Sequence, residues 1–188
     1  MGKRSDFARI DKDKYLTPYS AVPPLLPFLA PATRFVELCA GDGRLVGHLE
    51  QNGHICLGAS DIQPDKVHVR DRLRIETKDA LKISEIPCNM IITNPPWTRS
   101  ILIPMIQHFV TLGESWLLFD SNWANNLKAG PIGKAFCREI VPIGRVKWIE
   151  GSKHSAKDDC SWYRFSAAPG PTIFHFRAEK VKIKTQGQ

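Results

Sequence analysis

The chain has 188 residues, of which 43% are hydrophobic, and this length and composition fit one globular domain with a sizeable core. Its 26 lysines and arginines outnumber its 19 aspartates and glutamates, so the net charge of +7 favours a polyanionic partner, although it could also serve only solubility. The five cysteines are scattered without a Cys-x-x-Cys pair, which disfavours a disulfide framework and a zinc site and favours a reducing, cytoplasmic setting without a metal.

The first 32 residues predict a proline-rich entry to the domain. Four prolines interrupt the apolar stretch 21–32, so it predicts neither a signal peptide nor a membrane span. Tyr15-Leu16-Thr17-Pro18 indicates a turn that opens into a short helix ahead of the first strand. In the plainest interpretation Thr17 caps that helix and Pro18 occupies its first position.

A strand, a glycine turn and a helix follow. Residues 34–40 predict the first central strand, and Gly41-Asp42-Gly43 turns the chain into a helix that closes near residue 53. Because glycine lacks a Cβ, Gly41 and Gly43 let the backbone approach a ligand, while the helix start offers free N–H groups. Val46 stands where the dinucleotide fingerprint has a third small residue, which disfavours a nicotinamide cofactor.

Two acidic residues follow the next two predicted strands. Asp61 ends the strand 55–60 and lies 20 residues after Gly41 (61 minus 41), the spacing of a ribose-binding carboxylate in βαβ units. It could instead be a turn aspartate ahead of a proline. Asp79 follows the short strand 73–77, and capping of the next turn is an equally good account of it.

The stretch Thr93-Asn94-Pro95-Pro96-Trp97 leaves the end of a buried strand at 89–93, where α/β sheets bind ligands. Two prolines remove two backbone donors, so the Asn94 side chain and the carbonyls of Asn94 and Pro95 are predicted to be polar groups without competing local amide partners, and the two residues form an acceptor pair. A site that alkylates an exocyclic amine needs such acceptors and a flat surface for the ring, which Trp97 could supply. Asn-Pro is also a common turn opener, and the tryptophan could simply be packed.

The remainder of the sequence predicts the end of the sheet. Trp123 lies in a polar, aromatic loop and could line a base pocket, although burial against the sheet is the more ordinary outcome for tryptophan. The expected elements are a helix at 100–110, a buried strand at 114–120, an antiparallel hairpin from the runs 141–150 and 160–167, a polar loop at 151–159 and a last strand at 172–177.

In wording and order, these motifs resemble those of the S-adenosylmethionine-dependent amino-methyltransferases with an Asn-Pro-Pro-aromatic loop, above all the adenine-N6 DNA methyltransferases. The resemblance covers most of the chain and rests on Asn94-Pro95-Pro96-Trp97, the loop from Glu37 to Gly43, and the acids after the second and third strands. It implies an α/β, Rossmann-like class I methyltransferase fold with a doubly wound, mostly parallel seven-stranded sheet and an antiparallel C-terminal hairpin. The single domain would span 1–178, with a Thr-Pro element and helix at 1–32 and a disordered tail at 179–188.

The resemblance also implies S-adenosyl-L-methionine as the cofactor. Glu37 would lie near the methionine ammonium, Asp61 would bind the ribose, Ile62 would pack on the adenine and Asp79 would bind the adenine amine. The full implied cofactor set is Tyr15, Thr17, Glu37, Cys39, Ala40, Gly41, Gly43, Asp61, Ile62, Asp79, Ala80 and Asn94. Asn94, Pro95, Pro96 and Trp97 would form the catalytic loop for direct in-line transfer of the methyl group.

The substrate that the resemblance implies is the N6 amine of adenine in DNA, flipped out of the duplex. The expected substrate contacts are Trp97, Arg99, Trp123, Lys153 and Lys157. The last two join a basic group at the C-terminal hairpin that could grip phosphates or be only a solvated surface, with Arg138, Arg145, Lys147 and Arg164 as its other members. The chain lacks room for the target-recognition region of larger relatives, which leaves specificity to a possible protein partner. An RNA base, a protein glutamine amide, and a role as a non-catalytic, cofactor-binding nucleic-acid adaptor are the alternatives.

Overall fold

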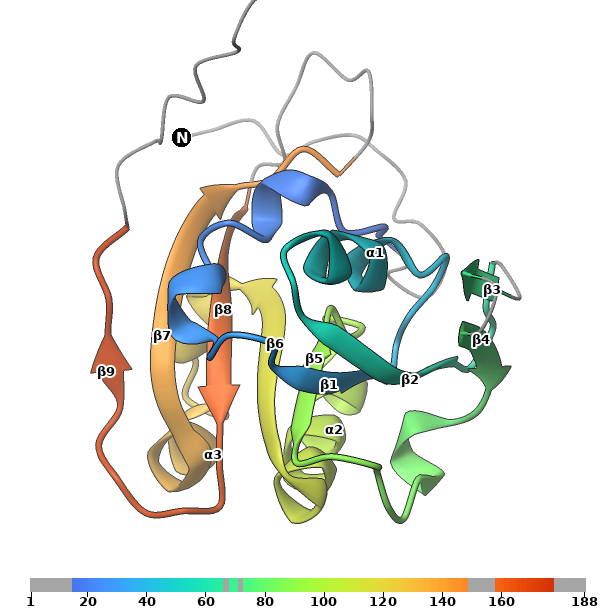
Figure 1. The fold of residues 1–188 in the computed structure, drawn as a ribbon. Helices are drawn as coiled ribbons and strands as arrows, with labels where there is room; N and C mark the ends of the chain where they lie inside the picture. Colours follow the sequence, from blue (N-terminus) through green and yellow to red (C-terminus); the bar gives the residue numbers. More distant parts are fainter. Residues whose placement is uncertain (1–14, 66–67, 71–72, 149–157, 178–188) are drawn as a thin grey trace, which may run out of the picture.

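The computed structural model describes residues 15–65, 68–70, 73–148 and 158–177, and a nine-stranded mixed sheet organises this part of the chain (Figure 1). The strand order is β3-β4-β2-β1-β5-β6-β8-β7-β9. The strands are β1 (Arg34–Glu37), β2 (Ile55–Asp61), β3 (His68–Arg70), β4 (Leu73–Thr77), β5 (Met90–Thr93), β6 (Glu114–Asp120), β7 (Cys137–Arg145), β8 (Asp159–Phe165) and β9 (Ile173–Phe174).

The five strands from β4 to β6 pair in parallel, as expected for a doubly wound α/β sheet. β8 is antiparallel to both β6 and β7, which confirms the predicted C-terminal hairpin. The sheet has two strands more than the predicted seven, because the short strands β3 and β9 extend its opposite edges (Figure 1). β3 pairs antiparallel with β4 over only three residues, a length that carries no periodic signal.

Helices and short turns cover both faces of the sheet. They are α1 (Arg44–Gln51), α2 (Arg99–Leu112), α3 (Gly130–Phe136) and the 3-10 turns η2 (Tyr19–Ala21), η3 (Leu26–Phe28), η4 (Ala80–Lys82) and η5 (Ser121–Asn125). α1, η2 and η3 pack on one face, and α2 and α3 on the other (Figure 1). Within the described ranges, no helix has the length and apolar character needed to cross a membrane.

Both predicted boundaries of the strand β7, which follows α3, were wrong. β7 begins at Cys137 and ends at Arg145, whereas the sequence predicted a strand over 141–150. The preceding helix α3 contains two glycines and a proline, residues with low helix propensity, so its sequence does not signal a helix. The predicted tail 179–188, most of the loop 151–159 and residues 1–14 lie outside the described residues.

Tertiary contacts fix the N-terminal segment and the end of the sheet. Trp162 is fully buried, and its Nε1 donates a 2.8 Å hydrogen bond to the carbonyl of Ala21, which pins the N-terminal segment to β8. On the other face the rings of Phe119 and Tyr163 stack at 4.2 Å, and Trp123 packs edge-on against both. The sheet therefore carries a core on each side.

We predict that Gly113→Ala destabilises the fold by about 1 to 3 kcal/mol, the usual scale of overpacking. A Cβ at Gly113 would lie 2.5 Å from the Asn89 carbonyl oxygen, and that atom belongs to backbone that cannot swing away. Gly47→Ala is the control, because its Cβ would meet nothing within 4 Å on α1 and should stabilise by about 0.5 to 1 kcal/mol. Urea unfolding measures both, and equal stability of Gly113→Ala and wild type would mean that the turn relaxes freely.

Candidate functional site

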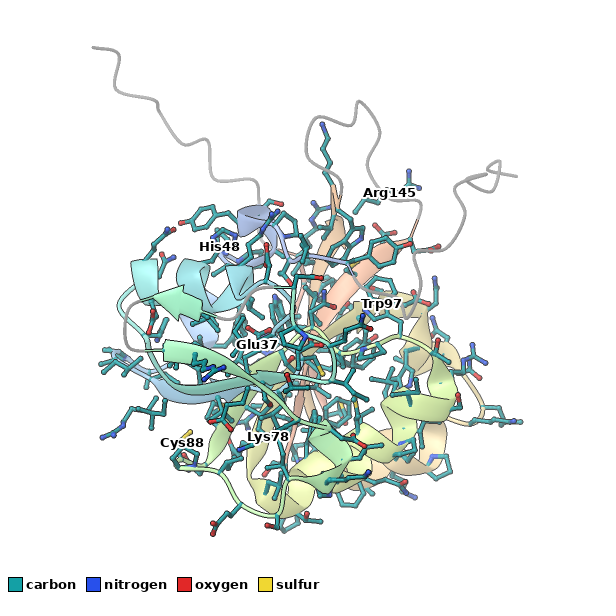
Figure 2. All side chains as sticks on the ribbon, turned by 90° about the vertical axis from the view of Figure 1, so that its right-hand side faces the viewer. Glu37, His48, Lys78, Cys88, Trp97 and Arg145 are labelled. Carbon is teal, nitrogen blue, oxygen red and sulfur yellow. The ribbon has the colours of Figure 1, made fainter. Side chains whose placement is uncertain are left out.

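A cavity of about 410 Å³ opens at the carboxyl ends of the central parallel strands. It lies where β1 has β2 on one side and β5 on the other, the point at which the strand order reverses. Eleven of the twelve residues in the predicted cofactor set line it, namely Tyr15, Thr17, Glu37, Cys39, Ala40, Gly41, Asp61, Ile62, Asp79, Ala80 and Asn94. Figure 2 shows Glu37 among the central strands and Trp97 to one side.

Asp61 ties the glycine loop to the end of β2. Its Oδ2 accepts a 2.8 Å hydrogen bond from the Gly41 amide, and its Oδ1 accepts one of 2.7 Å from the Gln63 amide. Gly41 has a φ of 55°, a left-handed conformation that suits glycine. Each carboxylate oxygen has a further lone pair, so Asp61 both builds the loop and can accept hydrogen bonds from a ligand in the cavity.

Gly43 is the member of the predicted set that does not line the cavity. It has a φ of 78°, and a Cβ there would lie 2.5 Å from Cγ2 of Val69. Gly43 therefore allows close packing of the loop against β3. That its backbone also lies close to a bound ligand stays a prediction.

Glu37 is a buried carboxyl group on the cavity wall. Its side chain is 1% exposed, and its Oε2 has no hydrogen-bond partner in the described part of the chain. Burial raises the pKa of Glu37 well above its usual value, and the nearby carboxylates of Asp61 and Asp42 raise it further. The site therefore holds a carboxyl group that a cationic group in the cavity would stabilise as carboxylate.

The Asn94 side chain makes three hydrogen bonds, two to residues far away in the sequence and one to the nearby indole of Trp97. Its Nδ2 donates to the Tyr15 carbonyl at 3.0 Å and to Oγ1 of Thr17 at 3.2 Å, and its Oδ1 accepts from Nε1 of Trp97 at 3.2 Å. The interpretation of Thr17 as a helix cap was wrong, because Pro18 holds that position and no side chain caps η2. Asn94 thus anchors the N-terminal wall of the cavity.

Trp97 is half-buried and belongs to an aromatic cluster with Tyr15 and Trp148. Its Nε1 also donates to the Leu118 carbonyl, and its ring meets Trp148 edge-on at 5.6 Å, while Tyr15 lies 6.0 Å from Trp148. Neither Trp97 nor the buried Pro95 lines the cavity, whereas Pro96 does.

Several residues around the cavity were not predicted from the sequence. Trp148 lies just beyond the end of β7 at Arg145, and its aromatic character is the signal that could have identified it. Ile101 and Met105 line the cavity from α2, and their i, i+4 spacing places both on one helix face. This spacing, directly after the Asn-Pro-Pro-Trp stretch, could have identified them.

Three predicted cavity residues have additional or different roles. Asp79 lines the cavity and also caps η4, because its Oδ1 accepts from the Leu81 amide at 3.0 Å. Ile62 stands at the rim with 63% of its surface exposed. Burial raises the pKa of the Cys39 thiol strongly, so it stays protonated and is a poor nucleophile.

The predicted substrate contacts are only partly available. Trp123 is 5% exposed and packs in the core, so it does not line a base pocket. Arg99 is exposed at the start of α2, and the Asn126 side-chain oxygen, in the amide orientation that satisfies both groups, accepts from its guanidinium. Lys153 and Lys157 lie outside the described residues.

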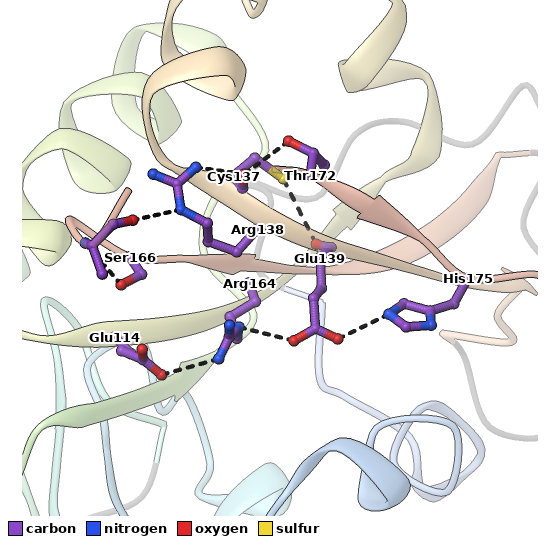
Figure 3. Close-up of polar contacts among 9 residues, drawn as sticks. Glu114, Cys137, Arg138, Glu139, Arg164, Ser166, Thr172 and His175 are labelled. Atoms are coloured by element: carbon purple, nitrogen blue, oxygen red, sulfur yellow. Dashed lines mark hydrogen bonds and ion pairs between the residues drawn. The ribbon is translucent and has the colours of Figure 1, made fainter. Parts of the chain in front are cut away.

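Two of the basic residues expected to grip phosphates are used within the protein (Figure 3). Arg138 is 6% exposed and donates to the carbonyls of Ala135, Cys137 and Ala168. Arg164 pairs with the carboxylates of Glu114 at 3.4 Å and Glu139 at 3.0 Å. By contrast, Arg145 and Lys147 are exposed near the aromatic cluster.

No protein-family model and no curated protein matches this sequence. Among solved structures, a TehB-like S-adenosylmethionine-dependent methyltransferase from Corynebacterium glutamicum matches with a TM-score of 0.52 and 16% identity, over 79% of this chain and 87% of its own. A dimethyladenosine transferase from Plasmodium falciparum matches with a TM-score of 0.55 and 15% identity, over 81% and 62%.

A methyltransferase subunit of a type I restriction-modification system from Streptococcus thermophilus matches with a TM-score of 0.58 and 9% identity. The match covers 87% of this chain and 48% of that subunit. These likenesses confirm the predicted Rossmann-like fold, the one that these methyltransferases share.

We predict that Glu37→Gln stabilises the protein at pH 7 by about 1 to 3 kcal/mol, the scale for relieving a buried, poorly satisfied polar group. The raised pKa means that the folded state keeps a proton which the unfolded state loses above its usual value of 4.5, so Glu37 lowers stability as the pH rises above 4.5. Urea unfolding between about pH 4 and pH 8 should therefore show a difference in unfolding free energy between Glu37→Gln and wild type that widens with pH. A gap of constant size would assign the effect to packing.

Proposed function

We propose that this protein is an S-adenosylmethionine-dependent methyltransferase that methylates the exocyclic N6 amine of adenine in DNA. The observation that carries the proposal is that one cavity, at the reversal of strand order, collects Glu37, Asp61 and Asn94. The fold shared with solved methyltransferases supports it, as does the Asn-Pro-Pro-Trp stretch beside the cavity.

The polar groups of the cavity suit this cofactor. The orphaned oxygen of Glu37 offers a buried acceptor to the methionine ammonium, and Asp61 has free lone pairs for the two ribose hydroxyls. Asp79 and Ile62, on the same wall, would meet the adenine. The volume of about 410 Å³ lies in the range of small-molecule sites. The cofactor, when bound, supplies an electrophilic methyl group on a sulfonium.

Asn94 is the residue that would hold the substrate amine. Both protons of its Nδ2 are committed to Tyr15 and Thr17, which fixes the amide plane and leaves one lone pair on Oδ1 beside the bond from Trp97. An amine N–H donated to this oxygen would be positioned and polarised by a group that needs no reorganisation. Because Cys39 stays protonated, the cavity favours direct transfer over a covalent intermediate on the chain.

The aromatic cluster and the net charge support a nucleic-acid substrate. The rings of Tyr15, Trp97 and Trp148 offer stacking surface beside Asn94, and stacking on aromatic rings accepts any unpaired base. The charge of +7 favours a phosphate backbone. A duplex substrate would have to flip its adenine out of the stack to bring the amine to Asn94.

A methyl-transfer assay tests the proposal. Methyl-labelled S-adenosylmethionine would be incubated with duplex DNA, single-stranded DNA, RNA and a glutamine-containing peptide, and the products hydrolysed for analysis. We expect N6-methyladenine from DNA. Label in RNA or in the peptide would reassign the substrate, and cofactor binding without transfer to any of the four would favour a non-catalytic adaptor.

Asp61→Ala should weaken S-adenosylmethionine binding by about 1 to 3 kcal/mol, the scale of lost charge-assisted hydrogen bonds. Isothermal titration calorimetry measures the loss, with Asp159→Ala as the control, because Asp159 is exposed at the start of β8. Since Asp61 also holds the Gly41 amide, urea unfolding of the same variant separates loop damage from lost ligand contacts. Unchanged affinity would remove Asp61 from the site.

Asn94→Ala should lower kcat by about 10²- to 10³-fold, as loss of a preorganised hydrogen-bonding group in an active site does, with a smaller change in cofactor affinity. Thr17→Val is the matched control, because it removes one acceptor of the Asn94 amide and keeps Oδ1. It should loosen the cavity wall and affect cofactor binding more than kcat. Steady-state kinetics and calorimetry decide, and equal kcat losses in both variants would make Asn94 only a structural anchor.

A further inference from the structure

The strand β9 forms one edge of the sheet (Figure 1), and its two apolar side chains are exposed. Ile173 is 51% exposed, Phe174 57% and Phe176 92%, and the two phenylalanine rings lie 5.9 Å apart. Proteins usually protect an edge strand with charges, prolines or a covering loop. Within the described ranges, β9 pairs only with β7.

The segment 173–177, which we call the edge segment, is held firmly beside β7. Ile173 pairs with Glu139 and Phe174 with Ile140, and the amide of His175 donates to the Ile140 carbonyl at 2.9 Å. The His175 ring bonds the Glu139 carboxylate at 2.8 Å (Figure 3) and meets the ring of Phe28 edge-on. These contacts fix one face of the segment, so the phenylalanines are exposed on a rigid support.

Among the residues that the structure describes, nothing pairs with one side of the edge segment's backbone. Because the His175 amide points toward β7, the amide and carbonyl of Phe174 point away from it, as successive residues of an extended strand alternate. Phe176 follows the end of β9, and its amide and carbonyl would point the same way in a chain that stays extended. Pairing of two such segments in antiparallel fashion about His175 would place Phe174 of each opposite Phe176 of the other. Each pair could then exchange both N–H···O bonds while the rings meet across the strands.

We propose that the edge segment is a homodimer interface, in which the β9 strands of two copies pair antiparallel and join the two sheets into one. The segment is complementary to itself in both backbone and side chains, which selects a second copy of this chain as the partner. Three strands, β6, β8 and β7, separate β9 from the strands around the cavity, so each copy keeps an open cavity.

The physical character of this dimer follows from its size and charge. Pairing through one short segment is a small contact, of the kind that gives weak, transient complexes, so we expect a weak monomer–dimer equilibrium. Each copy carries +7, and salt should strengthen the dimer by screening this repulsion. Nucleic-acid binding shows the opposite dependence, because salt weakens phosphate contacts.

Sedimentation equilibrium of the full chain tests the proposal over about 5 to 500 µM, at about 50 mM and 500 mM salt. Wild type should show a monomer–dimer equilibrium that tightens with salt. Phe176→Lys should weaken the dimer at least about tenfold, because charge on an edge strand opposes pairing. Leu127→Lys is the matched control: Leu127 is also 92% exposed and the added charge is the same, but it lies in the turn before α3, so dimerisation should persist.

Three outcomes would overturn the proposal: a wild type that stays monomeric throughout, a Phe176→Lys protein that dimerises like wild type, and open-ended aggregates in place of a discrete dimer. Circular dichroism checks that the variants fold. If Phe176→Lys does not fold, Phe176→Thr replaces it, because threonine keeps β propensity but removes the ring. Phe176 and Leu127 do not line the cavity, so the dimerisation test is valid whether or not methyl transfer is found.

Discussion

The reversal of the chain at β1 governs the rest of the molecule. From β1 the chain runs outward to β2 and β4, and it returns on the other side of β1 to form β5 and β6. The loops that leave β1 and β5 therefore diverge, and a cavity opens between them. Two side chains then define its walls, because Asp61 holds the glycine loop from one side and Asn94 holds the N-terminal segment from the other.

The electrostatics of the cavity oppose the stability of the fold. Glu37, Asp42 and Asp61 lie near one another with little exposure, and burial together with mutual repulsion raises the pKa of Glu37. A protein selected only for stability would replace such a carboxyl group with an apolar residue. The surrounding aromatic packing offsets the cost, as Phe119, Trp162 and other large rings are almost wholly buried on the two faces of the sheet.

The sequence predicted the elements whose signals are local. The strands 73–77 and 114–120 were located to the residue, because each is a compact β-favouring run between turns, and the spacing of Gly41 and Asp61 placed both at one cavity. The bonds from Asn94 to Tyr15 and Thr17 could not be predicted, since they join residues 79 and 77 positions apart and depend on the folded sheet. The prediction that Arg138 grips phosphates failed for a related reason: its sequence context does not reveal that its guanidinium donates to three carbonyls in the fold.

For the nucleic-acid substrate proposed above, the fixed orientation of the Asn94 amide would restrict which of the four bases the site accepts. Since its nitrogen is occupied by the N-terminal segment, only oxygen lone pairs can face a ring in the site. Adenine and cytosine would offer a hydrogen to that oxygen through their exocyclic nitrogens. Thymine has no exocyclic amine, and its carbonyl groups would set lone pair against lone pair and leave two buried acceptors unpaired. A single side-chain orientation, fixed by two residues far away in the sequence, would thus favour bases that carry an exocyclic amine over thymine before any reaction begins.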